Sequence, residues 1–206
     1  GFKPTGGRVP TEGGFPLSTT LDCFGPIGND VDTCAQAFGV LSGTAYHFSP
    51  DAANKCRLLV AQGFPCQELD ATVDYAWEAG LCALSEAGLK LGEIRTDAAF
   101  ASVAELDEIG AFTVPELLAA LHERGVKSLD GIDPMVRERI EMLRGMSAIN
   151  YARLLRHRSV CIANLDSQWN SGDILLIPTV PEVAPAIQDV QTVERQIAAT
   201  TRLVRN

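Results

Sequence analysis

The sequence lacks any apolar run of the ~18–20 residues that a helix needs to cross a bilayer, and it holds no internal repeats or low-complexity stretches. Positive charge is also scarce: 17 lysines and arginines stand against 26 aspartates and glutamates, which leaves a formal net charge of −9. The missing apolar run leads us to expect no membrane span. A chain with this net charge repels phosphate backbones, so we also expect no nucleic-acid binding by these residues. Hydrophobic residues make up 46% of the 206 positions, which argues against disorder, and the length suits one large domain or one and a half small ones.

The six cysteines form no C-x-x-C motif, and none stands at zinc-ligand spacing from a histidine. The sequence therefore predicts no metal site. Cys34, Cys82 and Cys161 fall in apolar helical patterns, where a free cysteine acts as a small hydrophobic residue. The first residues also lack the pattern of a signal peptide. We expect reduced structural thiols in a cytoplasmic protein, with a disulfide or a reactive thiol as the alternative.

Strand and helix patterns alternate in the middle of the chain. Residues 57–61 are typical of a short buried strand, Asp70 caps a helix that ends at Gly88, and residues 89–94 are consistent with a second strand. A strand, a helix and a strand of these lengths favour parallel pairing with a right-handed crossover. The predicted fold class is α/β, with a mixed, largely parallel sheet covered by helices.

Most of the remaining chain is predicted to be helical. Thr113 as N-cap and Glu116 three residues later form the sequence signature of a capping box, with Pro115 in the first turn. The other expected elements are a helix from a cap at Asn29 or Asp30 to Leu41, helical segments with breaks over 97–144, a long helix over 147–169, a strand over 173–181 and a final helix over 188–205.

The first 26 residues hold six glycines and four prolines, so they cannot form an ordinary helix or a central strand. We expect an irregular, well-ordered segment packed against the sheet. Arg8 offers a fixed fork of donors, and Asp22 is the expected acceptor in a network with it. The polar side chains that we single out in this segment are Lys3, Thr5, Arg8, Ser18, Thr19 and Asp22.

Two motifs in this segment are shared with a known family. Residues 1–9 carry G-x-K-P-T-x-G-R-V, and residues 16–26 carry P-L-S-x-T-L-D-x-x-G-P, in the family's order and at its separation. Residues 173–181 match the family's strand D-x-L-L-x-P-T-x-P, whose following loop borders the active-site cleft. The chain resembles the amidase signature family, whose members are serine hydrolases that cleave carboxamides.

The resemblance implies that residues 1–206 are the later part of a single amidase signature domain. In the family the nucleophilic serine, a bridging serine and a lysine base all lie before the position that matches Gly1. We therefore expect no catalytic residue in this chain, and we do not expect Ser18 to be the nucleophile. The resemblance also implies a small amide substrate, an acyl-enzyme intermediate, no cofactor, and a homodimer as one assembly.

The polar residues of the opening segment receive a supporting role from the resemblance. Lys3, Thr5, Arg8 and Asp22 would shape the structural loop behind the nucleophile. Lys3 in particular is expected to tie down loop carbonyls, since it does not correspond to the family's lysine base.

Arg139 is the candidate for substrate contact. Its segment, Val-Arg-Glu-Arg-Ile, resembles one in the glutamine amidotransferase A subunits, where the second arginine binds the substrate's α-carboxylate. Glu138 stands where that subgroup has its first arginine. The alternative for Arg139 is an ordinary helix-surface arginine paired with a glutamate.

Arg153, Arg156 and His157 fall roughly on one face of the long helix, with Arg158 beside them. A solvated helix face is the expected explanation, and a phosphate or carboxylate site is the alternative. The two other histidines, both expected in loops or on the surface, are His47 and His122.

Two further hypotheses compete with an amidase. The chain could belong to the A subunit of a glutamyl-tRNA amidotransferase-type complex, which delivers ammonia to a partner, and contact with tRNA would then need another domain or subunit. Alternatively, it is a non-catalytic structural fragment. Neither the cysteines nor the charge pattern separates these hypotheses.

Overall fold

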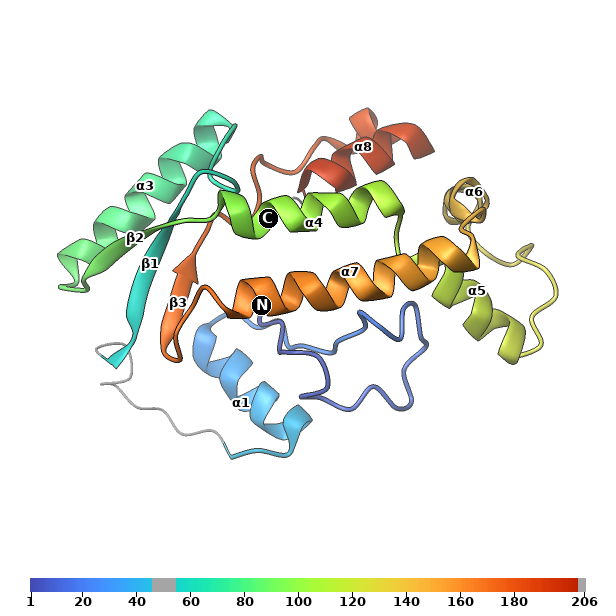
Figure 1. Cartoon of the computed structure of the whole chain (residues 1–206), viewed down its shortest axis with the longest axis horizontal. Helices are drawn as coiled ribbons and strands as arrows, with labels where there is room; N and C mark the ends of the chain where they lie inside the picture. Colours follow the sequence, from blue (N-terminus) through green and yellow to red (C-terminus); the bar gives the residue numbers. More distant parts are fainter. Residues whose placement is uncertain (46–54, 204–206) are drawn as a thin grey trace. The chain divides into compact units, whose positions relative to one another are not determined.

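The computed structural model describes residues 1–45 and 55–203 (Figure 1). The chain divides into two compact units, which are described one at a time. Unit 1 takes its described residues from the ranges 1–49, 111–132 and 140–146, and unit 2 from 50–110, 133–139 and 147–206. The predicted loop position of His47 lies outside the described residues.

Unit 2 is built on a parallel sheet of three strands in the order β2-β1-β3, formed by β1 (Arg57–Gln62), β2 (Leu91–Arg95) and β3 (Asp173–Leu176). Leu58 of the central strand pairs with Leu91 on one side and with Ile174 on the other. The four residues 58–61 are all buried, because a strand inside a parallel sheet is covered on both faces. The predicted α/β class is confirmed, and every strand among the described residues pairs in parallel.

Most helices of unit 2 begin where the sequence predicts. α3 (Ala71–Glu86) connects β1 to β2 and is capped by Asp70, whose carboxylate accepts from the Thr72 and Val73 amides at 2.7 and 2.8 Å. α7 (Ala148–Asp166) begins after Ser147, whose hydroxyl accepts from the Asn150 amide. The other helical elements are α4 (Asp97–Ile109), the 3₁₀ turn η1 (Ile187–Val190) and α8 (Val193–Leu203). α4 and α7 lie side by side (Figure 1).

Two predicted elements of unit 2 are shorter than expected. β3 ends at Leu176 rather than at residue 181, because Pro178 and Pro181 have no N–H to donate to a ladder. The final helix over 188–205 is split into η1 and α8. Cys82 was expected on an apolar helix face and is exposed, whereas Cys161 is buried as predicted.

Unit 1 combines the irregular opening segment with α1 (Val31–Ser42) and α5 (Thr113–Glu123). Asp30 caps α1 by accepting from the Thr33 amide at 2.7 Å, and Gly43 ends it in the left-handed conformation with a φ of 65°. α6 (Pro134–Leu143) contributes Ile140 to this unit. The core cluster of unit 1 consists of Val114, Leu117, Leu121 and Ile140, with Leu118, Leu129 and Ile132 packed against it.

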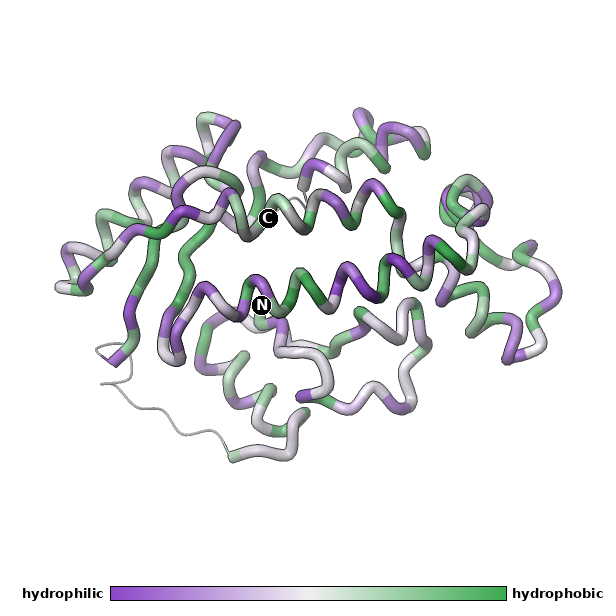
Figure 2. The backbone as a smooth tube through the Cα atoms, in the orientation of Figure 1, coloured by the Kyte–Doolittle hydropathy of each residue, from purple (hydrophilic) through white to green (hydrophobic). Residues whose placement is uncertain are grey.

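The hydropathy along the chain differs between the helices and the opening segment. Along α3, α4 and α7 hydrophilic and hydrophobic residues alternate, as in amphipathic helices (Figure 2). The opening segment has mostly pale colours, because Gly, Pro, Ser and Thr lie near the middle of the scale. Within the described ranges, no helix combines the length and the apolar character that a bilayer crossing demands.

Candidate functional site

The opening segment is irregular, as the sequence predicts, and its two motifs lie against each other. The Phe2 amide donates to the Pro26 carbonyl at 2.9 Å. The Cys23 thiol donates to the Pro4 carbonyl at 3.1 Å, and the Lys3 ammonium donates to the same carbonyl at 2.9 Å. Lys3 therefore has the bonding partner that the sequence predicts for it, a loop carbonyl. The expected packing of this segment against the sheet stays a prediction.

Gly25 is required where the two motifs meet. A Cβ atom at this position would lie 2.1 Å from the Phe2 carbonyl oxygen and 3.0 Å from the Pro4 ring. No side chain fits in that space, so the backbone of the second motif can approach the first only with glycine here.

Asp22 closes the second motif into a turn. Its carboxylate accepts from the Leu17 amide at 2.9 Å and from the Ser18 amide at 3.0 Å. In return, the Ser18 carbonyl accepts from the Leu21 and Asp22 amides at 3.0 and 2.7 Å. The turn is thus held both by the carboxylate of Asp22 and by its backbone amide.

The predicted network between Arg8 and Asp22 is wrong among the described residues. The Arg8 side chain is exposed, and Asp22 uses both carboxylate oxygens on the two amides beside it. Arg8 instead contributes its backbone, since its amide donates to the Thr5 carbonyl at 3.1 Å in a turn that needs a φ of 78° at Gly7. Amides four and five residues away satisfy Asp22 without ordering a long arginine side chain.

Glu116 provides the second carboxylate of the site. It lies in the first turn of α5 and is 7% exposed. The Ser18 hydroxyl donates to Glu116 Oε2 at 2.6 Å, the Thr20 amide donates to the same oxygen at 3.0 Å, and the Thr20 hydroxyl donates to Oε1. Ser18 itself is 1% exposed and Thr20 is half-buried, so the Ser18 side of this cluster is shielded from solvent.

The capping box predicted for α5 is therefore wrong. Phe112 occupies the N-cap position without a side-chain hydrogen bond, and α5 starts at Thr113. Glu116 turns to Ser18 and Thr20, which precede it by 98 and 96 residues. A local pattern such as S/T-x-x-E reports only nearby amides, so no local signal could have identified these partners.

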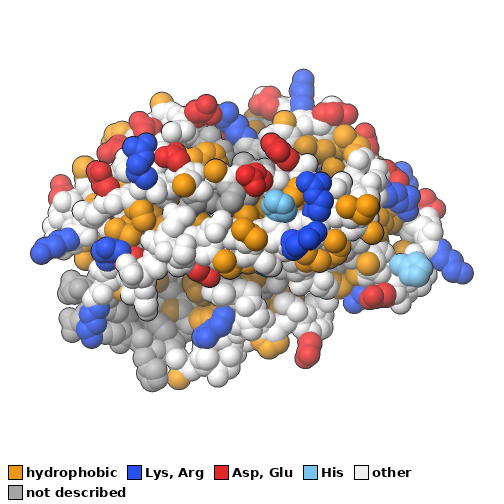
Figure 3. Space-filling model, viewed as in Figure 1, with side chains coloured by type: hydrophobic (Ala, Val, Ile, Leu, Met, Phe, Trp, Pro, Cys, Tyr) orange, Lys and Arg blue, Asp and Glu red, His pale blue; other side chains and the backbone are white. Residues whose placement is uncertain are grey.

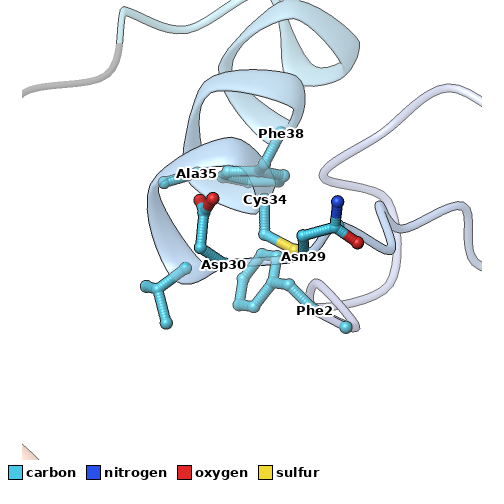
Figure 4. A pocket seen from close by; sticks show the side chains of 9 residues that line it. Phe2, Asn29, Asp30, Cys34, Ala35 and Phe38 are labelled. Atoms are coloured by element: carbon cyan, nitrogen blue, oxygen red, sulfur yellow. The ribbon is translucent and has the colours of Figure 1, made fainter.

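A pocket of about 540 Å³ lies beside the start of α1 in unit 1 (Figure 4). The ring of Phe2 contacts that of Phe38 edge-on at 4.9 Å, and Cys34 and Ala35 add to a largely apolar wall. Asp30 carries the one carboxylate of the lining. Its hydrogen bond with the Thr33 amide lowers its pKa and marks it as a helix cap. The pocket can accept an apolar group, but its lining offers no nucleophile and base in contact.

The carboxyl ends of the strands in unit 2 are joined by hydrogen bonds. Thr96, which is fully buried after β2, donates its amide to the Gln62 carbonyl at 3.1 Å and its hydroxyl to the Phe64 carbonyl. Asp70 accepts from the Val183 amide at 2.7 Å, and its own amide donates to the Pro181 carbonyl at 2.9 Å. Hydrogen bonds from the Val73 and Val183 amides lower the pKa of Asp70. The loop after β3 is thereby fixed at the start of α3.

Arg139 is half-buried on α6 and has neither a hydrogen bond nor an ion pair with any described residue. Its predicted substrate contact stays a prediction.

On α7, Arg153 and Arg156 are exposed, and His157 lies 3.9 Å from Glu105 of α4. Figure 3 shows Lys and Arg side chains gathered with one His over α4 and α7. This agrees with the solvated helix face that the sequence predicts. His122 is exposed, also as predicted.

The sequence profile of the family described as Amidase matches residues 1–204. The chain belongs to the amidase family. It is 29% identical over 212 residues to 2-amino-5-chloromuconic acid deaminase of Comamonas testosteroni, a match that covers 100% of this chain and 45% of the relative. It is 33% identical over 118 residues to indoleacetamide hydrolase of Pseudomonas syringae pv. syringae, covering 56% of this chain and 25% of the relative.

A solved structure, described as the crystal structure of an amidase, superposes with a TM-score of 0.75 at 21% identity and covers 90% of this amidase chain and 41% of its own. That likeness establishes the fold. The chain spans less than half the length of these relatives. Within the described residues, Ser18 donates to a carboxylate and Lys3 to a backbone carbonyl, so both motifs serve to hold the loop together.

Proposed function

We propose that the protein containing this chain hydrolyses a carbon–nitrogen amide bond through an acyl-enzyme. The observation that carries the proposal is the family match over residues 1–204. By the resemblance to the amidase signature family, the nucleophilic serine, the bridging serine and the lysine base would belong to a segment that these 206 residues do not include. This chain is then the later part of a single amidase signature domain and supplies supporting structure.

The hydrogen bonds of both units support this assignment. In unit 1 the two shared motifs form one loop, in which Gly25 allows the close approach and Asp22 closes the turn. Glu116 of α5 binds this loop, and the loop would stand behind the nucleophile. In unit 2 the loop after β3 is fixed by Asp70 at the carboxyl ends of parallel strands, where α/β proteins bind their ligands. A small amide substrate would be bound beside that loop.

Arg139 is proposed to bind a carboxylate on the substrate. It is half-buried and has no bonding partner among the described residues, so its guanidinium is available for a bidentate pair. If the substrate were glutamine and the product ammonia were passed to a partner, the protein would be an amidotransferase A subunit. The resemblance of residues 136–140 is the observation that favours this second candidate.

We further propose a cytoplasmic enzyme that forms a homodimer. None of the six cysteines, all of which lie in the described part of the chain, forms a disulfide, and burial raises the pKa of the Cys66 thiol, which disfavours its reactive thiolate. The absence of disulfides fits a reducing compartment. Size-exclusion chromatography with light scattering on the complete protein tests the dimer.

The function is tested by assaying the complete protein and the 206-residue chain side by side on a chromogenic anilide, glutamine and neutral aryl amides. We expect turnover by the complete protein and none by this chain, because nucleophile, base and oxyanion donors must act together. Ser18→Ala should leave kcat within about tenfold, whereas loss of a serine nucleophile costs about 10⁶-fold. Turnover by the chain alone that Ser18→Ala abolishes would overturn the proposal.

A further inference from the structure

The carboxylate of Glu116 lies where an unpaired charge would be strongly unfavourable. It is buried in the first turn of α5 and accepts from Ser18 and Thr20. A buried carboxylate is tolerated only when charge-assisted hydrogen bonds replace its water, and the N-terminal end of a helix adds favourable potential. Such an arrangement holds its donors in place more tightly than a neutral contact would.

Glu116 is also anchored from the other side. Its neighbours on α5, Val114, Leu117 and Leu121, belong to the core cluster of unit 1. The position of the carboxylate is therefore set by the core, and the position of Ser18 and Thr20 is set by the carboxylate. We propose that Glu116 is a positioning residue that fixes the turn of residues 15–22 to the core of unit 1.

The carboxylates of Asp22 and Glu116 bind different parts of this segment. Asp22 closes the turn on itself through the Leu17 and Ser18 amides, and it makes no use of α5. Glu116 joins the closed turn to α5 through Thr20 and the Ser18 hydroxyl. Removing Glu116 should release the turn as a unit while its internal hydrogen bonds persist.

This division gives a local signature in hydrogen exchange resolved to single amides. In Glu116→Gln the side chain loses its charge and one of its two acceptor oxygens, so the charge-assisted hydrogen bonds from Ser18 and Thr20 are weakened. The Thr20 amide should exchange at least ~10-fold faster, and the Leu17 and Ser18 amides should stay within ~3-fold of wild type. Asp22→Asn should give the reverse pattern.

Matched controls separate this local effect from a general loss of stability. Glu123→Gln alters an exposed glutamate on the same helix and should change nothing. Leu117→Ala opens the core cluster and should raise exchange throughout unit 1 rather than at Thr20 alone. Thr20→Val removes one hydroxyl donor and keeps the backbone amide, so it provides a milder variant if Glu116→Gln does not fold.

The catalytic consequence rests on the proposed function. A displaced wall of the site should lower kcat of the complete protein by ~10–100-fold in Glu116→Gln, with KM within ~3-fold, and Glu116→Asp should recover part of the loss. If wild type hydrolyses no amide, the proposed function fails while the exchange pattern still decides the role of Glu116. An unchanged Thr20 amide in a folded Glu116→Gln protein, or faster exchange spread evenly over unit 1, would overturn the inference.

Discussion

At the residue scale, the opening segment replaces regular secondary structure with side chains that act on the backbone. Asp22 and Glu116 accept from backbone amides, Lys3 donates to a carbonyl, and the cysteine at 23 donates to that same carbonyl. Backbone polar groups that are neither in a helix nor in a ladder must find other partners when they are buried. The shared motifs thus consist of the residues that satisfy an irregular backbone, together with the glycines that let it pass.

Gly25→Ala tests the close approach of the two motifs. The added Cβ would lie 2.1 Å from the Phe2 carbonyl oxygen, so the backbone must shift. We expect a loss of about 1–3 kcal/mol in the free energy of unfolding. The control is Gly80→Ala in α3, where a Cβ meets nothing within 4 Å and should stabilise by about 0.5–1 kcal/mol. Urea unfolding measures both, and equal effects would contradict this account.

At the scale of elements, β1 is the strand to which the rest of unit 2 is tied. It pairs with both other strands, and Arg57 at its start binds Asp173 at the start of β3 through two parallel hydrogen bonds of 2.8 and 2.7 Å. The Asp173 side chain is 5% exposed, while that of Arg57 is 58% exposed. Hydrogen bonds from Arg57 and from the Asn170 amide lower the pKa of Asp173 to about 2.

This ion pair predicts how the stability of unit 2 depends on pH. Because the pKa of Asp173 is depressed from 3.8 to about 2 in the folded protein, the ionised carboxylate stabilises the fold above the ordinary pKa. That contribution is lost as the pH falls from 3.8 through about 2. Asp173→Asn should therefore flatten the acid side of the stability curve and matter little for its shape near neutral pH. Urea midpoints measured across this range, with the exposed Asp189→Asn in unit 2 as control, decide the point.

At the scale of the whole molecule, local signals were sufficient to predict where most helices and strands lie. Asp70, Ser147 and Gly43 mark helix ends by side-chain caps or by a left-handed glycine, and each acts where it stands. The buried run after Arg57 likewise predicts a central parallel strand. The strand–helix–strand pattern of residues 57–94, together with the family resemblance, predicted the fold class correctly.

The sequence could not predict which distant groups meet. Glu116 satisfies a local capping pattern, yet its donors lie 96 and 98 residues earlier because folding brings α5 to the second motif. The sequence predicts Arg8 as the partner of Asp22, but the amides of Leu17 and Ser18 occupy both oxygens of that carboxylate. Cys82 followed the apolar pattern of α3, although no residue of that helix is fully buried. Tertiary packing decides each of these cases.

The last prediction concerns the substrate of the complete protein. If Arg139 binds a carboxylate, Arg139→Ala should lower kcat/KM by about 10–100-fold for amides that carry a carboxylate, such as glutamine, because a charge-assisted hydrogen bond contributes about 1.5–3 kcal/mol. Neutral aryl amides should be affected by less than about 3-fold, since they offer no anion to the guanidinium. Arg144→Ala is the control, because Arg144 is exposed and paired with Glu141 at 3.0 Å. Equal losses on charged and neutral amides would show that Arg139 supports the fold rather than selects the substrate.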